Sequence, residues 1–411
     1  MPVLRRFLVK GADAVSVPAG AMRAATEAVF AACGMAEKGA AGCADVLIAN
    51  DLRGNESHGV SNMLRRYVAW FRQGLQNPRP DVRLVRETPA TALMDADGGL
   101  GLHVGPRAMQ LAVDKAKAVG MGCVAVSNAG HLGGAGYHAS LAAEQGCIGQ
   151  CFGAPGGKMM CPTFGAEPRF GTHPMAWAAP AGKAAPFLFD VATTQVAANK
   201  IRLAARLGVK LAANWVTDRE GNVVEEEVDP PAEFFMTPMG GTREGSSHKG
   251  YGLACVVDIL CNTMPGIGAG FLTGGGGLLF CAYSIEAFTD RATYDHWMDR
   301  FLDGLRQTPP VAGEERVLYA GLHAHECTLE RLERGIPYHP EVLHWFSMIA
   351  GELGDSRLAE AVKALPACPA TEAQLAEWRG RERGVVGQDS MSHGGFADRL
   401  TDLSAGRWRR Q

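Results

Sequence analysis

Long apolar runs, an excess of charge of one sign and paired cysteine motifs are all missing from this chain of 411 residues. No stretch approaches the roughly 18 uninterrupted apolar residues of a membrane helix, and the apolar run that follows Arg6 is too short for an export signal. The 40 basic and 43 acidic side chains leave a net charge of −3, which gives no reason to expect nucleic acid or a membrane as partner. We therefore expect a cytoplasmic protein that binds a small molecule.

The 11 cysteines lack the spacing of a metal site or of a disulfide framework. Their number is odd and most lie in apolar stretches, which indicates reduced thiols in the core. Cys147 with Cys151, and Cys255 with Cys261, do not have the two-residue spacing of a zinc knuckle, and the 12 histidines form no H-x-x-x-H pair. The sequence therefore predicts no metal, and a metal hydrolase built on His and Asp is the function that it favours least.

The chain is long enough for two or three domains, and the pattern of apolar and polar residues changes along its length. Residues 19–68 have apolar side chains at helical spacing, and a Pro-rich stop follows at 77–80. From residue 87 onward, predicted strands alternate with predicted helices, which indicates an α/β sheet. Strands are predicted at 91–95, 122–127, 147–152 and 187–190, and helices at 105–119 and 136–144.

Helices are predicted again in the second half of the chain. A polar hairpin is expected at 215–222, followed by helices at 252–262, 284–306 and 327–334, with the glycine run at 274–277 as a turn. The pattern predicts a helix-rich domain made of residues 1–86 and 246–384 and an α/β domain at 87–245. The weakly apolar tail at 385–411 is expected to be a mobile arm.

A dinucleotide fingerprint is present only in a weak form. Gly134, Gly136 and Ala139 match G-x-G-x-x-A at the start of a predicted helix. A Rossmann site also needs an acidic residue about 20 positions further on to bind the ribose, and none lies in that region. Close packing of a helix explains these glycines better than a Rossmann site does.

Four histidines lie in polar turns next to glycine: His58, His131, His173 and His248. Glycine allows a substrate to approach the backbone, and neutral imidazole titrates near pH 7, which suits proton exchange with an alcohol oxygen. Any one of these histidines alone would be read as an ordinary surface or core residue. Their shared context favours a site for acid–base chemistry.

A carboxylate and a lysine extend this pattern. Asp190 ends a predicted strand beside Thr193, where it could accept hydrogen bonds from ribose hydroxyls or from an imidazole N–H. Lys249 precedes a predicted helix, where its charge could meet a phosphate or a carboxylate. These residues therefore add candidate contacts for a small anionic ligand.

Six blocks occur in a fixed order along residues 17–337. They are residues 49–54 with 57–59, residues 130–131, residues 164–166 with 171–174, residues 189–194, Lys200, and residues 248–253. In order and spacing they resemble the non-Rossmann malate/L-lactate dehydrogenase family. The resemblance implies an α/β fold of the L-sulfolactate/malate dehydrogenase type, with residues 87–245 as the cofactor-binding domain and a homodimer as the usual assembly.

The resemblance also implies an oxidoreductase that uses NAD or NADP to interconvert a small 2-hydroxy acid and its 2-oxo acid. His58 and His131 match the two active-site histidines of the family, one of them the proton donor and acceptor. The positions that it assigns to substrate are Arg53, Ser57, Asn62 and Arg65. The positions that it assigns to the cofactor are Thr172, His173, Asp190, Ala192, Thr193, His248, Lys249 and Gly250.

Departures from the family pattern leave alternatives open. The family often has arginine, a bidentate carboxylate ligand, where this chain has Asn62, with Arg65 and Arg66 beyond it. It often has asparagine where this chain has His173. A reductase of cyclic imino acids, with the carboxylate ligand displaced to Arg65, is therefore one alternative. Residues 320–322 and the loop of residues 153–161 also depart from the family pattern, and they leave a non-catalytic relative that binds a dinucleotide as another.

Overall fold

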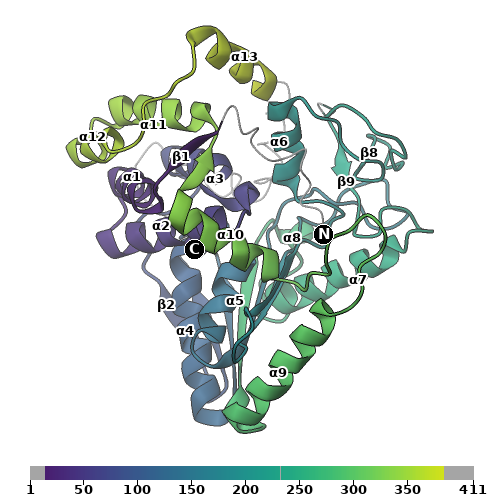
Figure 1. Cartoon of the computed structure of the whole chain (residues 1–411). Coiled ribbons are helices and arrows are strands. Elements are labelled where there is room, and N and C mark those ends of the chain that lie inside the picture. Colours follow the sequence, from purple (N-terminus) through teal and green to yellow (C-terminus); the bar gives the residue numbers. More distant parts are fainter. Residues whose placement is uncertain (1–13, 232, 384–411) are drawn as a thin grey trace.

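A seven-stranded mixed sheet forms the centre of the protein, which a computed structural model describes over residues 14–231 and 233–383 (Figure 1). The strand order is β2-β3-β4-β10-β5-β6-β7. The strands are β2 (Arg83–Glu87), β3 (Thr91–Asp95), β4 (Met121–Ser127), β5 (Cys147–Ala154), β6 (Met175–Ala179), β7 (Phe187–Val191) and β10 (Gly277–Ser284). The expected α/β class is confirmed.

The central strand β10 distinguishes this sheet from a Rossmann sheet. It runs antiparallel to both β4 and β5, so that Phe280 lies opposite Val124 on one side and Cys151 on the other. Only β3 and β4 pair in parallel, with α4 (Gly101–Val119) as their crossover. Strand β10 was not predicted from the sequence, because the glycine run at 274–277, whose last residue begins the strand, was interpreted as a turn. The expected division into domains stays a prediction. The structure shows in addition that the central strand of the sheet comes from a segment beyond residue 246.

The two faces of the sheet are covered by different helices. Helix α4 and α5 (Ala135–Ala143) pack on one face over a core of small side chains. On the other face, α7 (Ser247–Asp258) and the π-helical turn η3 (Ile259–Thr263) cover β5 and β10. Small side chains dominate the interface between the sheet and helices α4 and α5, because these helices lie close to the strands.

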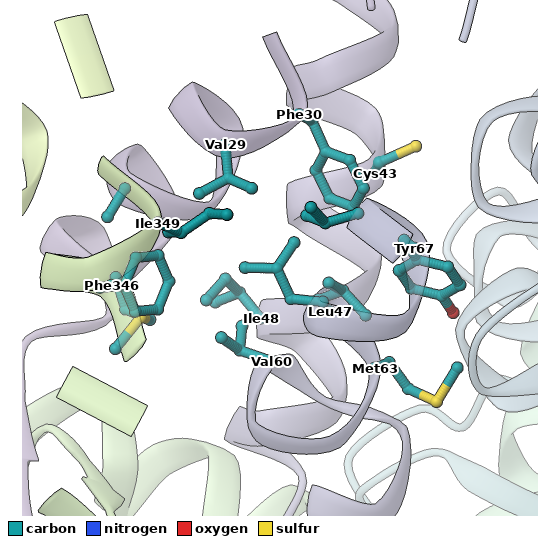
Figure 2. Packing of buried hydrophobic residues seen from close by; sticks show 14 of the residues in the cluster. Val29, Phe30, Cys43, Leu47, Ile48, Val60, Met63, Tyr67, Phe346 and Ile349 are labelled. Atoms are coloured by element: carbon teal, nitrogen blue, oxygen red, sulfur yellow. The ribbon is translucent and has the colours of Figure 1, made fainter. Parts of the chain in front are cut away.

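A helical unit packs beside the sheet and has its own apolar core (Figure 2). Its helices are α1 (Ala19–Ala32), α2 (Glu37–Leu52), α3 (Val60–Arg72), α11 (Pro340–Leu353) and α12 (Ser356–Lys363). Both halves of the sequence contribute, since β1 (Val15–Val17) pairs with β11 (Ile336–Tyr338). Figure 2 shows the ring of Tyr67 in this core, with its hydroxyl oxygen at the edge.

The remaining elements surround the sheet and the helical unit. They are η2 (Glu56–His58), α6 (Ala198–Leu207), β8 (Val216–Thr217), β9 (Phe235–Met236), α8 (Gly270–Thr273), η4 (Ile285–Ala287), α9 (Arg291–Arg306), α10 (Leu322–Arg334) and α13 (Glu372–Arg383).

Several predicted elements shift at their ends. The helix expected at 284–306 is a strand end, the short η4 and then α9, which begins where Asp290 caps it through the N–H of Thr293. The helices expected from 105 and 252 begin earlier, at Gly101 and Ser247. The expected hairpin forms, since Thr217 bridges Val223 and the N–H of Asp218 donates to the carbonyl oxygen of Asn222, and β8 pairs in addition with the distant β9. The tail at 385–411 lies outside the described residues.

Gly149 tests the close approach between the sheet and α5. A Cβ at Gly149 would lie 2.2 Å from the carbonyl oxygen of Ala139, whereas a Cβ at Gly42 in α2 would meet nothing within 4 Å. We expect Gly149→Ala to lower the free energy of unfolding by about 1–3 kcal/mol through overpacking. Gly42→Ala is the matched control and should raise it by roughly 0.5–1 kcal/mol. Equal unfolding midpoints in urea for the two variants would contradict this account.

Candidate active site

A cavity of about 470 Å³ opens at one edge of the sheet. Its walls include the loops that follow β4, β5 and β7 and those that precede β6 and β10, which all meet at this edge. Residues of η2, α3 and the first turn of α6 complete its wall. Ligands of open α/β sheets commonly bind at such an edge, and the volume is in the range of small-molecule sites.

Two imidazoles lie together in this cavity. His58 ends η2 and His131 lies in the loop after β4. Their ring centroids are 5.9 Å apart and their planes are within 9° of parallel. Two turns that are far apart in the sequence therefore meet at one point, as the acid–base hypothesis requires.

Backbone geometry determines the tautomer of His131. Its Nδ1 atom lies 3.1 Å from the amide nitrogen of Gly133 and 2.8 Å from the hydroxyl of Tyr67. An amide N–H can only donate, so Nδ1 is an acceptor without a proton. Neutral His131 consequently has its proton on Nε2. Because the ring of Tyr67 is part of the helical core, that core also orients the imidazole.

A chain of four hydrogen bonds gives His58 the opposite tautomer. It starts at the carbonyl oxygen of Val46, which can only accept and takes the amide of Asn50 at 2.8 Å. Asn50 Oδ1 then accepts from Asn55, 3.1 Å away, and Asn55 Oδ1 accepts from the hydroxyl of Ser57 at 2.9 Å. Ser57 Oγ therefore accepts from Nδ1–H of His58, 2.9 Å away. The Nε2 atom of neutral His58 carries a lone pair.

Both imidazoles are kept neutral by their surroundings. Burial, together with the positive charges of Lys200 and Arg66, lowers the pKa of His58 to about 4. Burial, His58 and the two guanidinium groups of Arg66 and Arg202 lower the pKa of His131 as well. A neutral imidazole can accept a proton at one nitrogen and donate a hydrogen bond from the other.

Asp190 lines the cavity at the end of β7. Its Oδ2 atom accepts the N–H of Gly136, 2.7 Å away in the first turn of α5. Burial raises the pKa of Asp190 to about 6, although this N–H and the guanidinium of Arg53 act in the opposite direction. Arg53 lies behind the cavity wall, where it donates to Ser140 Oγ at 3.1 Å.

Comparison with known proteins agrees with this geometry. The family model for malate/L-lactate dehydrogenase matches residues 17–346. The chain belongs to this family. Malate dehydrogenase of Pyrococcus abyssi is 35% identical over 342 residues, which cover 79% of this chain and 91% of that protein. L-sulfolactate dehydrogenase of Methanocaldococcus jannaschii is 34% identical over 332 residues, or 78% and 92% of the two chains.

Solved structures of the family have the same fold. The crystal structure of malate dehydrogenase from Entamoeba histolytica superposes with a TM-score of 0.79 at 28% identity, over 83% of this chain and 99% of that one. The resemblance inferred from the six sequence blocks is therefore confirmed. These relatives are dehydrogenases of hydroxy acids, and the chain is accordingly an oxidoreductase acting on a CH–OH group.

Some of the residues that the sequence assigned to the site line the cavity, and the others lie outside its wall. Those that line the cavity are Ser57, His58, His131, Thr172, Asp190 and Ala192. Thr193 is buried directly behind Thr172 and donates its N–H to the carbonyl oxygen of that residue at 3.0 Å. For the whole group, a role in binding or catalysis stays a prediction.

Asn62 and Arg65 do not line the cavity. Asn62 donates to the carbonyl oxygen of Glu56 at 2.8 Å, and Arg65 forms an ion pair with Glu341 on α11. The next residue, Arg66, is rotated by about 100° around α3 and does line the cavity. Arg66 was not assigned to the site from the sequence, because the pattern of α3 alone does not give the position of α11.

Four further predicted residues lie on or beneath α7, outside the cavity wall. His173 is buried and pairs with Asp258 Oδ2 at 3.0 Å, which ties the loop before β6 to α7. His248 and Lys249 are exposed in the first turn of α7, and Gly250 packs against the backbone of Met239. Their assignment to the cofactor stays a prediction.

A group of polar and basic side chains on α6 was not assigned to the site from the sequence. Asn199, Lys200 and Arg202 line the cavity, and of these only Lys200 belonged to a recognised block. The dense basic residues in this otherwise apolar helix were an available signal. Within residues 14–231 and 233–383, no group of three or more His, Cys, Asp or Glu side chains could bind a metal, and no helix is long and apolar enough to cross a membrane.

Nitrogen-15 NMR of the histidine rings tests the two tautomers. At pH 6 we expect both rings to be neutral, His58 with its proton on Nδ1 and His131 with its proton on Nε2. Since its pKa is about 4 rather than the ordinary 6.5, His58 should become charged only as the pH falls toward 4. Arg66→Gln removes a nearby cation and should raise that pKa.

Tyr67→Phe is the control for His131, because the N–H of Gly133 remains to fix the tautomer. The same tautomer in both rings, or a His58 pKa near 6.5 in the unaltered protein, would contradict the hydrogen-bond assignment.

Proposed function

We propose that this protein interconverts a small 2-hydroxy acid and its 2-oxo acid with NAD or NADP. The observation that supports this most directly is the pair of imidazoles in one cavity, with a lone pair on Nε2 of His58 and a proton on Nε2 of His131. Arg66 lies in the same cavity and can bind the carboxylate. Together these groups match the needs of hydride exchange at a carbinol carbon.

The walls of the cavity fit a dinucleotide. Gly156 and the loop of residues 274–277 present bare backbone, and a Cβ at Gly156 would fall 2.5 Å from the carbonyl oxygen of Gly274. Thr172, Asp190 and Ala192 would contact the nucleotide, with Asp190 as an acceptor for hydroxyl groups. When bound, the nicotinamide accepts or supplies the hydride.

The side chains of this protein would manage the proton and the orientation of the substrate. His58 Nε2 takes the proton of the substrate hydroxyl during oxidation and returns it during reduction, while Ser57 accepts from Nδ1–H in both states. His131 donates its Nε2–H to the same substrate oxygen. It is a poor proton carrier because the N–H of Gly133 already occupies Nδ1.

Fluorescence of the reduced dinucleotides tests the function itself. We expect NADH or NADPH to bind the purified protein and to be oxidised when a 2-oxo acid is added. No binding of either dinucleotide up to millimolar concentration would contradict the proposal. Binding without turnover of any 2-oxo acid or cyclic imino acid would favour the non-catalytic alternative, and turnover of the imino acid alone would favour a reductase.

Glutamine substitutions separate the two histidines. His58→Gln cannot accept and release a proton, so we expect kcat to fall by roughly 10²–10⁴, the usual effect of one acid–base group. His131→Gln keeps an N–H donor and should lose less than roughly tenfold, whereas His131→Ala should lose more. Dinucleotide binding should be retained in all three. A larger loss of kcat for His131→Gln than for His58→Gln would make His131 the proton carrier and His58 the hydrogen-bond donor.

A homodimer is the assembly that we propose. Leu253, Val256 and Ile259 form an apolar stripe along α7 and η3, and each is 38–53% exposed. A second copy would cover this stripe, since surfaces of this kind commonly mark interfaces. Light scattering should give twice the chain mass of 43.6 kDa, and Val256→Glu should give the single mass. Val311→Glu, at another exposed apolar residue, is the control. A monomer in the unaltered protein would contradict the proposal.

A further inference from the structure

A C-terminal segment reaches the wall of the cavity from beyond the region that the family model matches. That match ends at residue 346, and residues 364–383, here called the strap, follow α12 and end in α13. Figure 1 shows α13 extending from the helical unit across to α6. Of the described elements, α6 is the one against which α13 packs most closely, and α6 carries the cavity residues Asn199, Lys200 and Arg202. A segment beyond the matched region therefore packs on a helix of the active site.

The first half of the strap is a short and stiff connection. Leu365 is buried and belongs to the core of the helical unit. Pro366 and Pro369 follow it, and each proline ring fixes a backbone dihedral. Thr371 and Gln374 then begin α13 as a capping box, because Thr371 Oγ1 accepts the N–H of Gln374 at 3.3 Å and Gln374 Oε1 accepts the N–H of Thr371 at 2.9 Å. The strap is consequently anchored in the helical unit at one end and helical at the other.

Leu375 is the side chain through which α13 packs. Among residues 371–377, whose side chains the structure describes, Leu375 alone is buried, with 2% exposure. The buried side of a surface helix faces the element that it packs against, which is α6 here. Burial of a leucine favours the docked position of such a helix by roughly 10- to 10²-fold. Loss of this one side chain would therefore release α13 without removing a residue from the cavity.

Helix α6 determines the surroundings of His58. Asn199 donates from Nδ2 to the carbonyl oxygen of Ser57, 2.7 Å away, so the first turn of α6 is tied to η2. Burial, and then the positive charges of Lys200 and Arg66, lower the pKa of His58 to about 4. Burial also lowers the pKa of Lys200. The charge of Lys200 thus acts on His58 from within the wall, where water screens it little.

We propose that the strap holds α6 against η2 and keeps Lys200 beside the imidazole of His58, with Leu375 as the positioning residue. Helix α6 contacts both α13 and η2. Release of α13 would allow α6 to move outward and Lys200 to become hydrated. Docking of α13 and binding of a ligand that contacts α6 then favour each other, because both stabilise the same position of α6. The effect on catalysis rests on the proposed function, whereas the position of Lys200 can be measured without a substrate.

The pKa of His58, followed by nitrogen-15 NMR, tests the strap without a substrate. Leu375→Gln removes the apolar contact and keeps a good helix former. We expect the pKa of His58 to rise in this variant from about 4 toward the ordinary 6.5, since Lys200 moves into water. Arg66 and the stacked ring of His131 belong to other elements and should stay in place. Leu375→Met, which keeps an apolar side chain of similar size, should restore the pKa of the unaltered protein.

Two controls separate this effect from a general loss of stability. Ala376→Gln changes the exposed neighbour of Leu375 on the same helix and should leave the pKa of His58 unchanged. Leu302→Ala removes a buried side chain of α9 from a separate core, so it should lower the unfolding midpoint in urea and leave the pKa of His58 unchanged. A pKa in Leu375→Gln equal to that of the unaltered protein would overturn the proposal, as would an equal rise in either control.

Steady-state kinetics measure the effect of the strap on catalysis. In Leu375→Gln we expect KM for the 2-oxo acid to rise by roughly tenfold, because the wall formed by α6 is displaced, and kcat at about pH 8 to change by less than roughly twofold. Oxidation of the hydroxy acid fails at low pH as His58 gains a proton, and this acidic limb should lie at higher pH in the variant.

The two readouts distinguish failure of the strap from failure of the proposed function. A raised pKa of His58 in Leu375→Gln, with no turnover by the unaltered protein, would support the strap and remove the proposed function. Turnover by the unaltered protein, with KM and the pKa of His58 unchanged in Leu375→Gln, would overturn the strap and leave the proposed function standing.

Discussion

Two backbone groups, the carbonyl of Val46 and the amide of Gly133, determine the chemistry that the two imidazoles can perform. A carbonyl can only accept and an amide N–H can only donate, so neither can adapt to an imidazole of the wrong tautomer. The carbonyl of Val46 acts on His58 through three side chains, whereas the amide of Gly133 donates to His131 directly. The two rings are consequently unlike, although both are neutral and half-buried in the same cavity.

The helical unit contributes more than a wall for the cavity. Tyr67 extends from its apolar core to His131, and the packing of α3 directs Arg65 to α11 and Arg66 to the cavity. A rotation of α3 would therefore displace an imidazole and exchange the cation at the same time. The site is as rigid as the core beneath it, so a change in the volume of a core side chain such as Phe30 or Leu47 would be transmitted to the site.

The sequence predicted the parts of this fold that depend on local pattern. Glycine-flanked turns indicated His58 and His131, and alternation of strands and helices indicated the sheet. Long-range packing decided the rest. The position of β10 depends on pairing with β4 and β5, more than a hundred residues earlier, and the choice between Arg65 and Arg66 depends on α11. His173 fits a polar turn in sequence, but Asp258 draws it into the interior.

The position of the central strand β10 late in the sequence has a consequence for biosynthesis. The cavity edge needs β4, β5 and β10 together, and β10 ends at Ser284. A nascent chain that has emerged only as far as α6 must leave the gap between β4 and β5 open, with the edges of both strands unpaired. Such edges invite pairing with other chains, so the interval before β10 emerges from the ribosome is when this protein is most exposed to aggregation.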